Sequence, residues 1–328
     1  LRGRALRDLS ILLAVMLGIL LVHPTMGVLI GVVLSCLLFI TDMARPMIVA
    51  RGTGATLLSR RGRSAHDMDL LRQYGGRTLV LRLQGVLFFG NGDDLDTELR
   101  RLEPQFDTVI LDMRRVSDID ATGNKLLNDM SNRLAKNGRS LCIAGLTPEL
   151  ALFLGQAIQT APDLDAALER FEEKSLGEGV NSTLAQDDLE FLATLPADRR
   201  EVFARAIEHR DYAAGDVLCR LGDPGDGMWI VLTGSISVRV QSTSGALRVA
   251  GIASGAPAGE LALLEGSPRS ADLVADGALQ TLYLSTSAFE TLSHDAPDIG
   301  QAIITWIAVI TAQRLRSSSE ALRFAASE

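Results

Sequence analysis

The most conspicuous feature of the chain is an apolar run near its beginning. Residues 9–41 contain no Asp, Glu, Lys or Arg, and about 20 apolar residues suffice for a helix to span a bilayer. The segment HPTMG at residues 23–27 divides the run, because Pro24 disrupts a helix. Arginines flank both ends of the run, so the positive-inside rule places both flanks on the cytoplasmic side. The pattern predicts a short membrane helical hairpin over residues 1–50; a buried core helix is the alternative.

Residues 77–174 alternate between apolar strands and amphipathic helices. Strand-like runs of apolar residues begin near residues 77, 106 and 139, and a helical pattern follows each of them. Such alternation predicts a mixed α/β domain. The polar stretch at residues 51–76 is expected to be a linker.

The pattern changes again after a second linker at residues 175–186, which is rich in Gly, Ser and Asn. Residues 187–328 begin with short amphipathic helices and continue as many short apolar strands separated by glycines. They end in a long helical pattern, in which Leu315 and Leu322 lie one heptad apart. This order predicts a β-roll with helices before and after it.

Composition and charge narrow the range of possible partners. The chain has 328 residues, is 47% apolar and carries a net charge of −8, with the negative excess after residue 76. An acidic protein of this kind is not expected to bind nucleic acid, whereas the basic stretch before residue 77 suits anionic membrane lipid. The three cysteines and four histidines show no ligand spacing, so neither a metal site nor a disulfide framework is expected.

The α/β region resembles the STAS domain of sulfate transporters and anti-sigma-factor antagonists. The matching segments are LQGVLFFGN at residues 83–91 and VILDMRRVSDIDATG at residues 109–123. Because these segments follow an apolar run that ends in ARP at residues 44–46, the chain looks like the C-terminal part of a SulP-type anion permease. The resemblance implies a bacterial-type inner-membrane location, cytoplasmic STAS and nucleotide-binding domains, a transmembrane domain mostly missing from this chain, and, by family analogy, a homodimer.

One loop departs from the STAS pattern. Soluble STAS antagonists carry a phosphorylated serine in an Asp-Ser-Ser-Gly loop, and the corresponding residues here are Asp120, Ala121, Thr122 and Gly123. Alanine stands where the phosphoserine would be, so the loop is not expected to be switched by phosphorylation at position 121. Asp120 is instead expected to cap the following helix.

The β-roll resembles the cyclic-nucleotide-binding domain of catabolite activators and kinase regulatory subunits. GDPGDGMWIVLTGSISV at residues 222–238 matches the glycine-bracketed hairpin of that family, and GELALLEGSPRSA at residues 259–271 matches its phosphate-binding cassette. The resemblance implies cAMP as a regulatory ligand, with cGMP as the alternative, and no other cofactor.

The cassette has the chemistry that a cyclic nucleotide requires. Gly259 lets the backbone approach a ligand closely, and the Glu260 carboxylate can accept a hydrogen bond from a ribose 2′-hydroxyl. Arg269 can pair with the cyclic phosphate through charge-assisted bonds, and the Ser270 hydroxyl adds a donor. With Leu261, these are the predicted ligand-binding residues. The alternative is a surface Glu260–Arg269 salt bridge, worth about 0–1 kcal/mol.

These features predict the regulatory region of a SulP-type anion transporter that senses a cyclic nucleotide and relays it through the STAS domain to the membrane domain. On this interpretation the chain is not an enzyme and has no catalytic residues. One alternative is the regulatory tail of a glutaminase-like enzyme, although the chain lacks the Ser-x-x-Lys motif of that catalytic domain. A soluble partner-switching signalling protein is another alternative.

Overall fold

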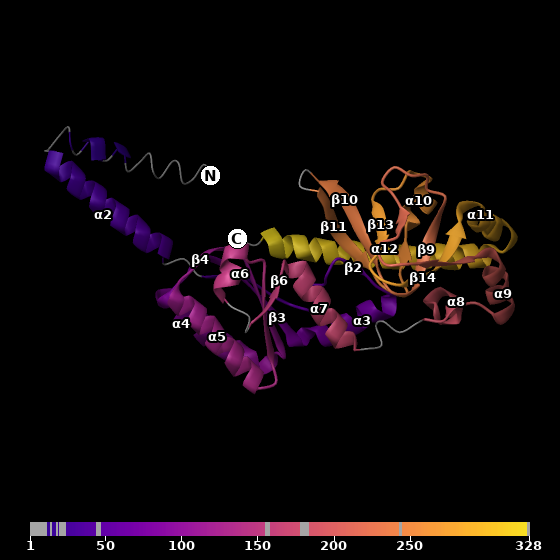
Figure 1. Cartoon of the computed structure of the whole chain (residues 1–328), viewed down its shortest axis with the longest axis horizontal. Helices are drawn as coiled ribbons and strands as arrows, with labels where there is room; N and C mark the ends of the chain where they lie inside the picture. The colour runs from indigo at the N-terminus through magenta and orange to yellow at the C-terminus, as the bar shows by residue number, and fades with distance from the viewer. Residues whose placement is uncertain are drawn as a thin grey trace. The chain divides into compact units, whose positions relative to one another are not determined.

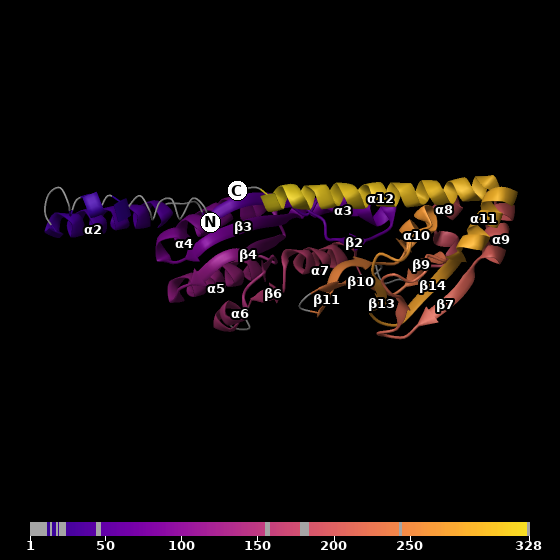
Figure 2. The same cartoon turned by 90° about the horizontal axis from the view of Figure 1, so that it is seen from above.

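The computed structural model describes residues 12–13, 15–17, 19, 24–43, 47–154, 158–177, 184–242 and 245–326. The chain divides into two compact units, residues 1–47 and 48–328, which are drawn in Figures 1 and 2.

The first unit contains helix α2, Pro24–Met43. Pro24 is its first residue, where proline fits because its missing N–H would lack a helical partner anyway. The first half of the predicted hairpin lies mostly outside the described residues. Within the part of the chain that the structure describes, no helix is both long and apolar enough to cross a membrane. The predicted hairpin is therefore not supported.

The second unit begins with a five-stranded sheet in the order β1-β3-β4-β5-β6. Strand β1 is antiparallel to β3, and the other neighbouring strands are parallel. The strands are β1 Ile48–Thr53, β3 Thr78–Leu87, β4 Thr108–Ile119, β5 Ser140–Ala144 and β6 Gln159–Ala161. The helices of this domain are α3 Ala65–Tyr74, α4 Phe89–Leu102, α5 Ala121–Lys136, α6 Pro148–Leu154 and α7 Leu164–Leu176.

The continuous apolar runs of β3 and β4 reflect burial on both faces of the sheet, as expected for central parallel strands. Val80 and Ile110 are fully buried and belong to one core cluster with Ala167 and Phe171 of α7. Helix α5 packs against β4 and β5 and buries Leu127, Met130 and Leu134 along one stripe. The alternating pattern therefore folds as the predicted mixed α/β domain.

Residues 51–76, expected to be a linker, are folded in the structure. They include the end of β1, the short strand β2 at Arg61–Gly62, and α3, which Ser64 caps by accepting a hydrogen bond from the Asp67 amide. Strand β2 pairs with β11 of the β-roll, so this segment contributes to both domains. The sequence did not indicate this role, because a polar segment is expected to be exposed. Two of its arginines, Arg61 and Arg63, are instead buried in ion pairs.

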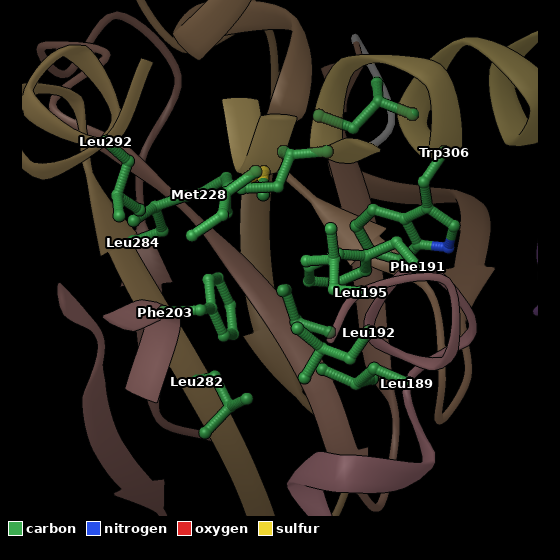
Figure 3. Close-up of a cluster of buried hydrophobic side chains, with 14 of the residues drawn as sticks. Leu189, Phe191, Leu192, Leu195, Phe203, Met228, Leu282, Leu284, Leu292 and Trp306 are labelled. Atoms are coloured by element: carbon green, nitrogen blue, oxygen red, sulfur yellow. The ribbon is translucent and has the colours of Figure 1, made fainter. Parts of the chain in front are cut away.

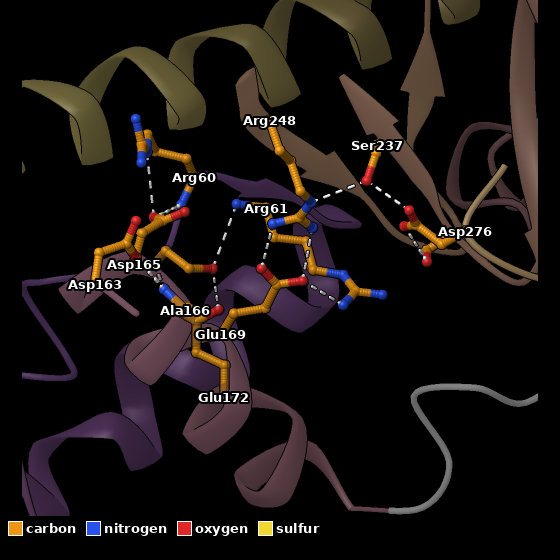
Figure 4. A network of polar contacts seen from close by, with 12 residues as sticks. Arg60, Arg61, Asp163, Asp165, Ala166, Glu169, Glu172, Ser237, Arg248 and Asp276 are labelled. Atoms are coloured by element: carbon orange, nitrogen blue, oxygen red, sulfur yellow. Dashed lines mark hydrogen bonds and ion pairs between the residues drawn. The ribbon is translucent and has the colours of Figure 1, made fainter. Parts of the chain in front are cut away.

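Those ion pairs form part of a polar network on α7 (Figure 4). Glu169 accepts from Arg61 at 2.7 Å and from both terminal nitrogens of Arg248 on β11 at 2.9 and 3.0 Å. Burial alone would raise the pKa of Glu169, but the two arginines outweigh burial and lower it. The carboxylate therefore stays charged and links α7 to two strands of the β-roll.

The β-roll consists of a five-stranded sheet, β2-β11-β10-β13-β8, and a four-stranded sheet, β12-β9-β14-β7. Its strands after β2 are β7 Glu208–Tyr212, β8 Val217–Cys219, β9 Gly227–Thr233, β10 Ile236–Ser242, β11 Gly245–Ile252, β12 Pro257–Ala258, β13 Asp272–Ala275 and β14 Leu279–Ser285. The accompanying helices are α8 Glu190–Ala193, α9 Ala197–Ala206, α10 Glu260–Glu265, α11 Thr286–Asp295 and α12 Pro297–Ala326.

The helices close over one end of the roll through a shared apolar core (Figure 3). Phe203 of α9 is fully buried, and its ring meets that of Phe191 edge to face with centroids 5.2 Å apart. The Trp306 ring of α12 lies 5.0 Å from Phe191 on another side. This core fixes the first half of α12 against the roll and so positions the residues that follow it along the helix.

Candidate functional site

The cassette predicted from the sequence, residues 259–271, begins with a tight turn at Gly259 after β12 and continues through α10 into the loop that follows it. Gly259 has φ +76°, and a Cβ atom there would lie 2.6 Å from Nη1 of Arg269 and 3.2 Å from the Trp229 ring. Only glycine fits both the left-handed backbone and this close approach. Gly266, with φ +63°, ends α10 and lets the chain turn back toward the site.

Arg269 lies beneath this turn and is 3% exposed. Its Nη1 donates to the carbonyl of Gly259 at 3.1 Å, and its Nη2 donates to Oδ1 of Asp226 at 2.9 Å. The guanidinium carbon lies 4.7 Å from the centroid of the Trp229 ring. The buried Nε has no hydrogen-bond partner among the described residues. A buried donor without a partner is costly, so this guanidinium has unused capacity for an acceptor.

Asp226 is much more exposed than its partner, with 70% of its side chain accessible. Burial and then a hydrogen bond with Asp226 raise the pKa of Tyr283 to about 12. The neutral Tyr283 hydroxyl and Arg269 thus converge on one surface carboxylate. Arg269 is buried but Asp226 is not, so solvent screens the pair from one side and it holds Arg269 at only about 1 kcal/mol.

Glu260, the first residue of α10, is 6% exposed and pairs with a residue that the sequence did not indicate. Nη1 of Arg314 donates to Oε1 of Glu260 at 2.7 Å, and Nη2 of Arg314 donates to the carbonyl of Pro257 at 3.0 Å. No hydrogen bond to the second oxygen, Oε2, occurs among the described residues. The predicted alternative, a direct Glu260–Arg269 salt bridge, is absent from the described residues, because each side chain pairs elsewhere.

All five predicted ligand-binding residues line a single cavity of about 260 Å³. Arg314 lines the same cavity from α12. The thiol of Cys219 also lies there, and burial raises its pKa, which keeps it neutral. The cavity therefore offers two arginines, the carboxylates of Glu260 and Glu265, and an apolar wall. The described residues contain no group of three or more His, Cys, Asp or Glu side chains that could hold a metal ion.

In the α/β domain, residues 120–123 form the start of helix α5. Oδ1 of Asp120 accepts from the Gly123 amide at 2.6 Å, so Asp120 caps α5, whose first residue is Ala121. A Cβ at Gly123 would lie 2.8 Å from the Leu87 carbonyl oxygen, which explains the glycine. Thr122 is exposed beside them.

Comparison with known families accounts for both domains. Residues 71–157 match the STAS domain and residues 209–295 match the cyclic nucleotide-binding domain. The chain contains both domains. The nucleotide-binding match includes the whole cassette and Asp226, and it implies that a cyclic nucleotide is the ligand.

Two curated relatives match most of the chain. It is 28% identical to glutaminase 2 of Bradyrhizobium diazoefficiens over 78% of its own length and 43% of that protein. It is 26% identical to glutaminase 1 of the same organism over 84% of its length and 46% of that protein. The chain thus spans less than half the length of these relatives. A cyclic nucleotide-gated potassium channel of Mesorhizobium japonicum is 37% identical, but over only 30% of the chain and 26% of the channel.

These relatives correct three expectations from the sequence. The expectation that the chain is not an enzyme is contradicted, because two relatives that match most of it are glutaminases. The expected inner-membrane location is contradicted by the same comparison with two glutaminases. The SulP permease assignment has no support, since the STAS domain that suggested it also matches within the glutaminase alignments.

Proposed function

We propose that this chain is the cyclic-nucleotide-sensing regulatory part of a glutaminase-like enzyme. The observation that carries the proposal is the alignment with two glutaminases across both the STAS and the nucleotide-binding regions. The cavity supports the sensing role, since it gathers Glu260, Arg269 and Ser270 from separate parts of the cassette. The activity being regulated is hydrolysis of the glutamine side-chain amide.

The proposed binding mode uses the unsatisfied capacity of the site. The cyclic phosphate takes the place of Asp226 beside Arg269, where the partnerless Nε and the released Nη2 can both donate to it. Oε2 of Glu260 accepts from the ribose 2′-hydroxyl, and the Ser270 hydroxyl donates to the phosphate. Gly259 keeps the backbone out of the space that the ligand needs.

The experiment is a calorimetric titration of the chain with cAMP and with cGMP, followed by assays of glutamate release in the enzyme that carries the chain. A cyclic purine nucleotide is expected to bind and to change the rate of glutamine hydrolysis. Binding without any change in rate would contradict the regulatory role, and the lack of binding at millimolar nucleotide would contradict the site itself.

Asp226→Asn is expected to tighten nucleotide binding by up to about fivefold. The exposed Asp226 carboxylate competes with the phosphate for Arg269, and its ion pair is worth about 0–1 kcal/mol. Asp298→Asn is the control, because Asp298 also pairs with an arginine, Arg199, at 3.0 Å, but both members of that pair are exposed and Asp298 does not line the cavity. Weaker binding by Asp226→Asn in calorimetry would show that Asp226 assists the ligand rather than competing with it.

A further inference from the structure

The last turn of α12 is buried in the α/β domain. Phe324 is 7% exposed and belongs to the core cluster that contains Val80 and Ile110 of the central strands. Gly52 of β1 lies beside it: a Cβ there would only touch the Phe324 ring, at 3.4 Å, but would overlap Leu57 of the same core. By contrast, Leu322, two residues earlier on the same helix, is 69% exposed. One aromatic side chain of the nucleotide-binding region therefore completes the core of the STAS domain.

Two arginines of the STAS domain bind the end of this helix. Nη1 of Arg82 donates to the carbonyl of Phe324, and its guanidinium lies over the Phe324 ring, 4.3 Å from the centroid. Nη2 of Arg115 donates to the carbonyl of Ala325 at 3.3 Å. The last carbonyls of a helix lack helical partners and carry partial negative charge, so arginines are suitable partners for them.

The Arg82 side chain is itself held in place. It is 3% exposed, and its Nε donates to Oδ2 of Asp112 at 3.0 Å. Burial alone would raise the pKa of Asp112, but bonds to Arg114 and Arg82 outweigh burial and lower it. The socket around Phe324 is thus an apolar pocket with a fixed, charged donor, Arg82, at its rim.

The same helix reaches the ligand cavity ten residues earlier. Arg314 pairs with Oε1 of Glu260 and leaves Oε2 toward the cavity without a hydrogen bond among the described residues. A continuous helix separates Arg314 from Phe324 by about 15 Å. Arg314 can therefore stay beside Glu260 only while the position and direction of helix α12 do not change.

We propose that docking of Phe324 in the STAS socket and occupancy of the nucleotide cavity are thermodynamically coupled through α12. Docked α12 holds Arg314 against Glu260, and this pair presents Oε2 to the ribose hydroxyl. Nucleotide binding in turn stabilises docking by the same factor, because coupling between two sites is reciprocal. The coupling rests on the proposed function, whereas docking itself does not. The nucleotide binds in the β-roll, and the STAS domain is the part of the chain that responds to that binding.

The test compares Phe324→Ala with Leu322→Ala, which removes an exposed side chain from the same turn. The first readout, without ligand, is amide hydrogen exchange of residues 320–326. The second is the dissociation constant for cAMP or cGMP, measured by calorimetry on the full chain. Phe324→Ala is expected to speed exchange and to weaken nucleotide binding about fivefold or more, within the usual range of such couplings. Leu322→Ala is expected to change neither readout appreciably.

Phe324→Leu guards against loss of folding, because it keeps most of the apolar volume and removes only the ring beneath Arg82. Its exchange and affinity are expected to fall between those of wild type and Phe324→Ala. Unchanged exchange in Phe324→Ala would overturn the docking. Faster exchange with unchanged affinity would overturn the coupling. A wild-type chain that binds neither nucleotide would overturn the proposed function and the coupling with it, while the exchange result would still decide the docking.

Discussion

Arg269→Ala is expected to weaken binding of a cyclic nucleotide by about 2–5 kcal/mol, the usual cost of removing one partner from a buried charged pair. The bound phosphate would lose its only buried cationic partner in the cassette, and water could not replace it beneath Gly259. The fold should tolerate the change, because the partner that Arg269 leaves behind, Asp226, is exposed to solvent. Calorimetric titration with cAMP and cGMP measures the effect directly.

Two further variants complete this test: one separates the positive charge of Arg269 from the geometry of its donors, and the other is a control. Arg269→Lys keeps the charge but not the planar fork of donors, so its affinity should lie between those of wild type and Arg269→Ala. Arg205→Ala is the matched control: its guanidinium is 79% exposed and pairs only with Glu201 on the same helix among the described residues. If Arg269→Ala binds the nucleotide as tightly as the Arg205→Ala control does, Arg269 is not part of the binding site.

The sequence was sufficient to locate the cassette because its residues are close together in the chain. Gly259, Glu260 and Arg269 lie within eleven positions, and a glycine-bracketed turn brings them together without help from distant elements. Asp226 and Arg314 could not be found in this way. They come from a surface loop and from the last helix, and only the folded roll places them beside the cassette.

The strands and helices after residue 76 largely follow the predicted order, because periodicity follows from burial, but β1, β2 and α3 lie in segments that were expected to be a membrane hairpin and a linker. Pairing of charges was not predictable. Arg61 and Arg63 looked like part of a polar linker, although carboxylates of α7 bury them. The apolar run before residue 42 led to a predicted membrane hairpin that the described residues do not support, since no helix among them is both long and apolar enough to cross a membrane.

Arg63→Ala is expected to lower the free energy of unfolding by about 3–5 kcal/mol, because it leaves a buried carboxylate without its counter-charge. The Arg63 side chain is fully buried, and its Nη2 donates to Oε2 of Glu172 at 3.1 Å. Glu172 is 6% exposed and also accepts from the amide and hydroxyl of Ser59. These neutral donors cannot replace a cation. Urea denaturation measures the loss.

Arg60→Ala is the matched control for this loss. Arg60 is three positions away, half exposed, and paired with Asp165 at 3.3 Å, so its removal should cost about 0–1 kcal/mol. Equal losses in the two variants would mean that the Arg63–Glu172 pair adds nothing beyond a surface pair.

The pH dependence gives a second, independent check on this pair. Burial raises the pKa of Glu172 in the folded chain, while Arg63 and Ser59 oppose that rise. Without Arg63, the pKa of Glu172 should rise further. A carboxyl whose pKa is raised by folding destabilises the fold above that pKa, and the penalty disappears as pH falls and the group is protonated in both states. The difference in stability between wild type and Arg63→Ala should therefore narrow toward acidic pH. A difference that stays constant would point to lost packing of the arginine stem rather than to an unpaired charge.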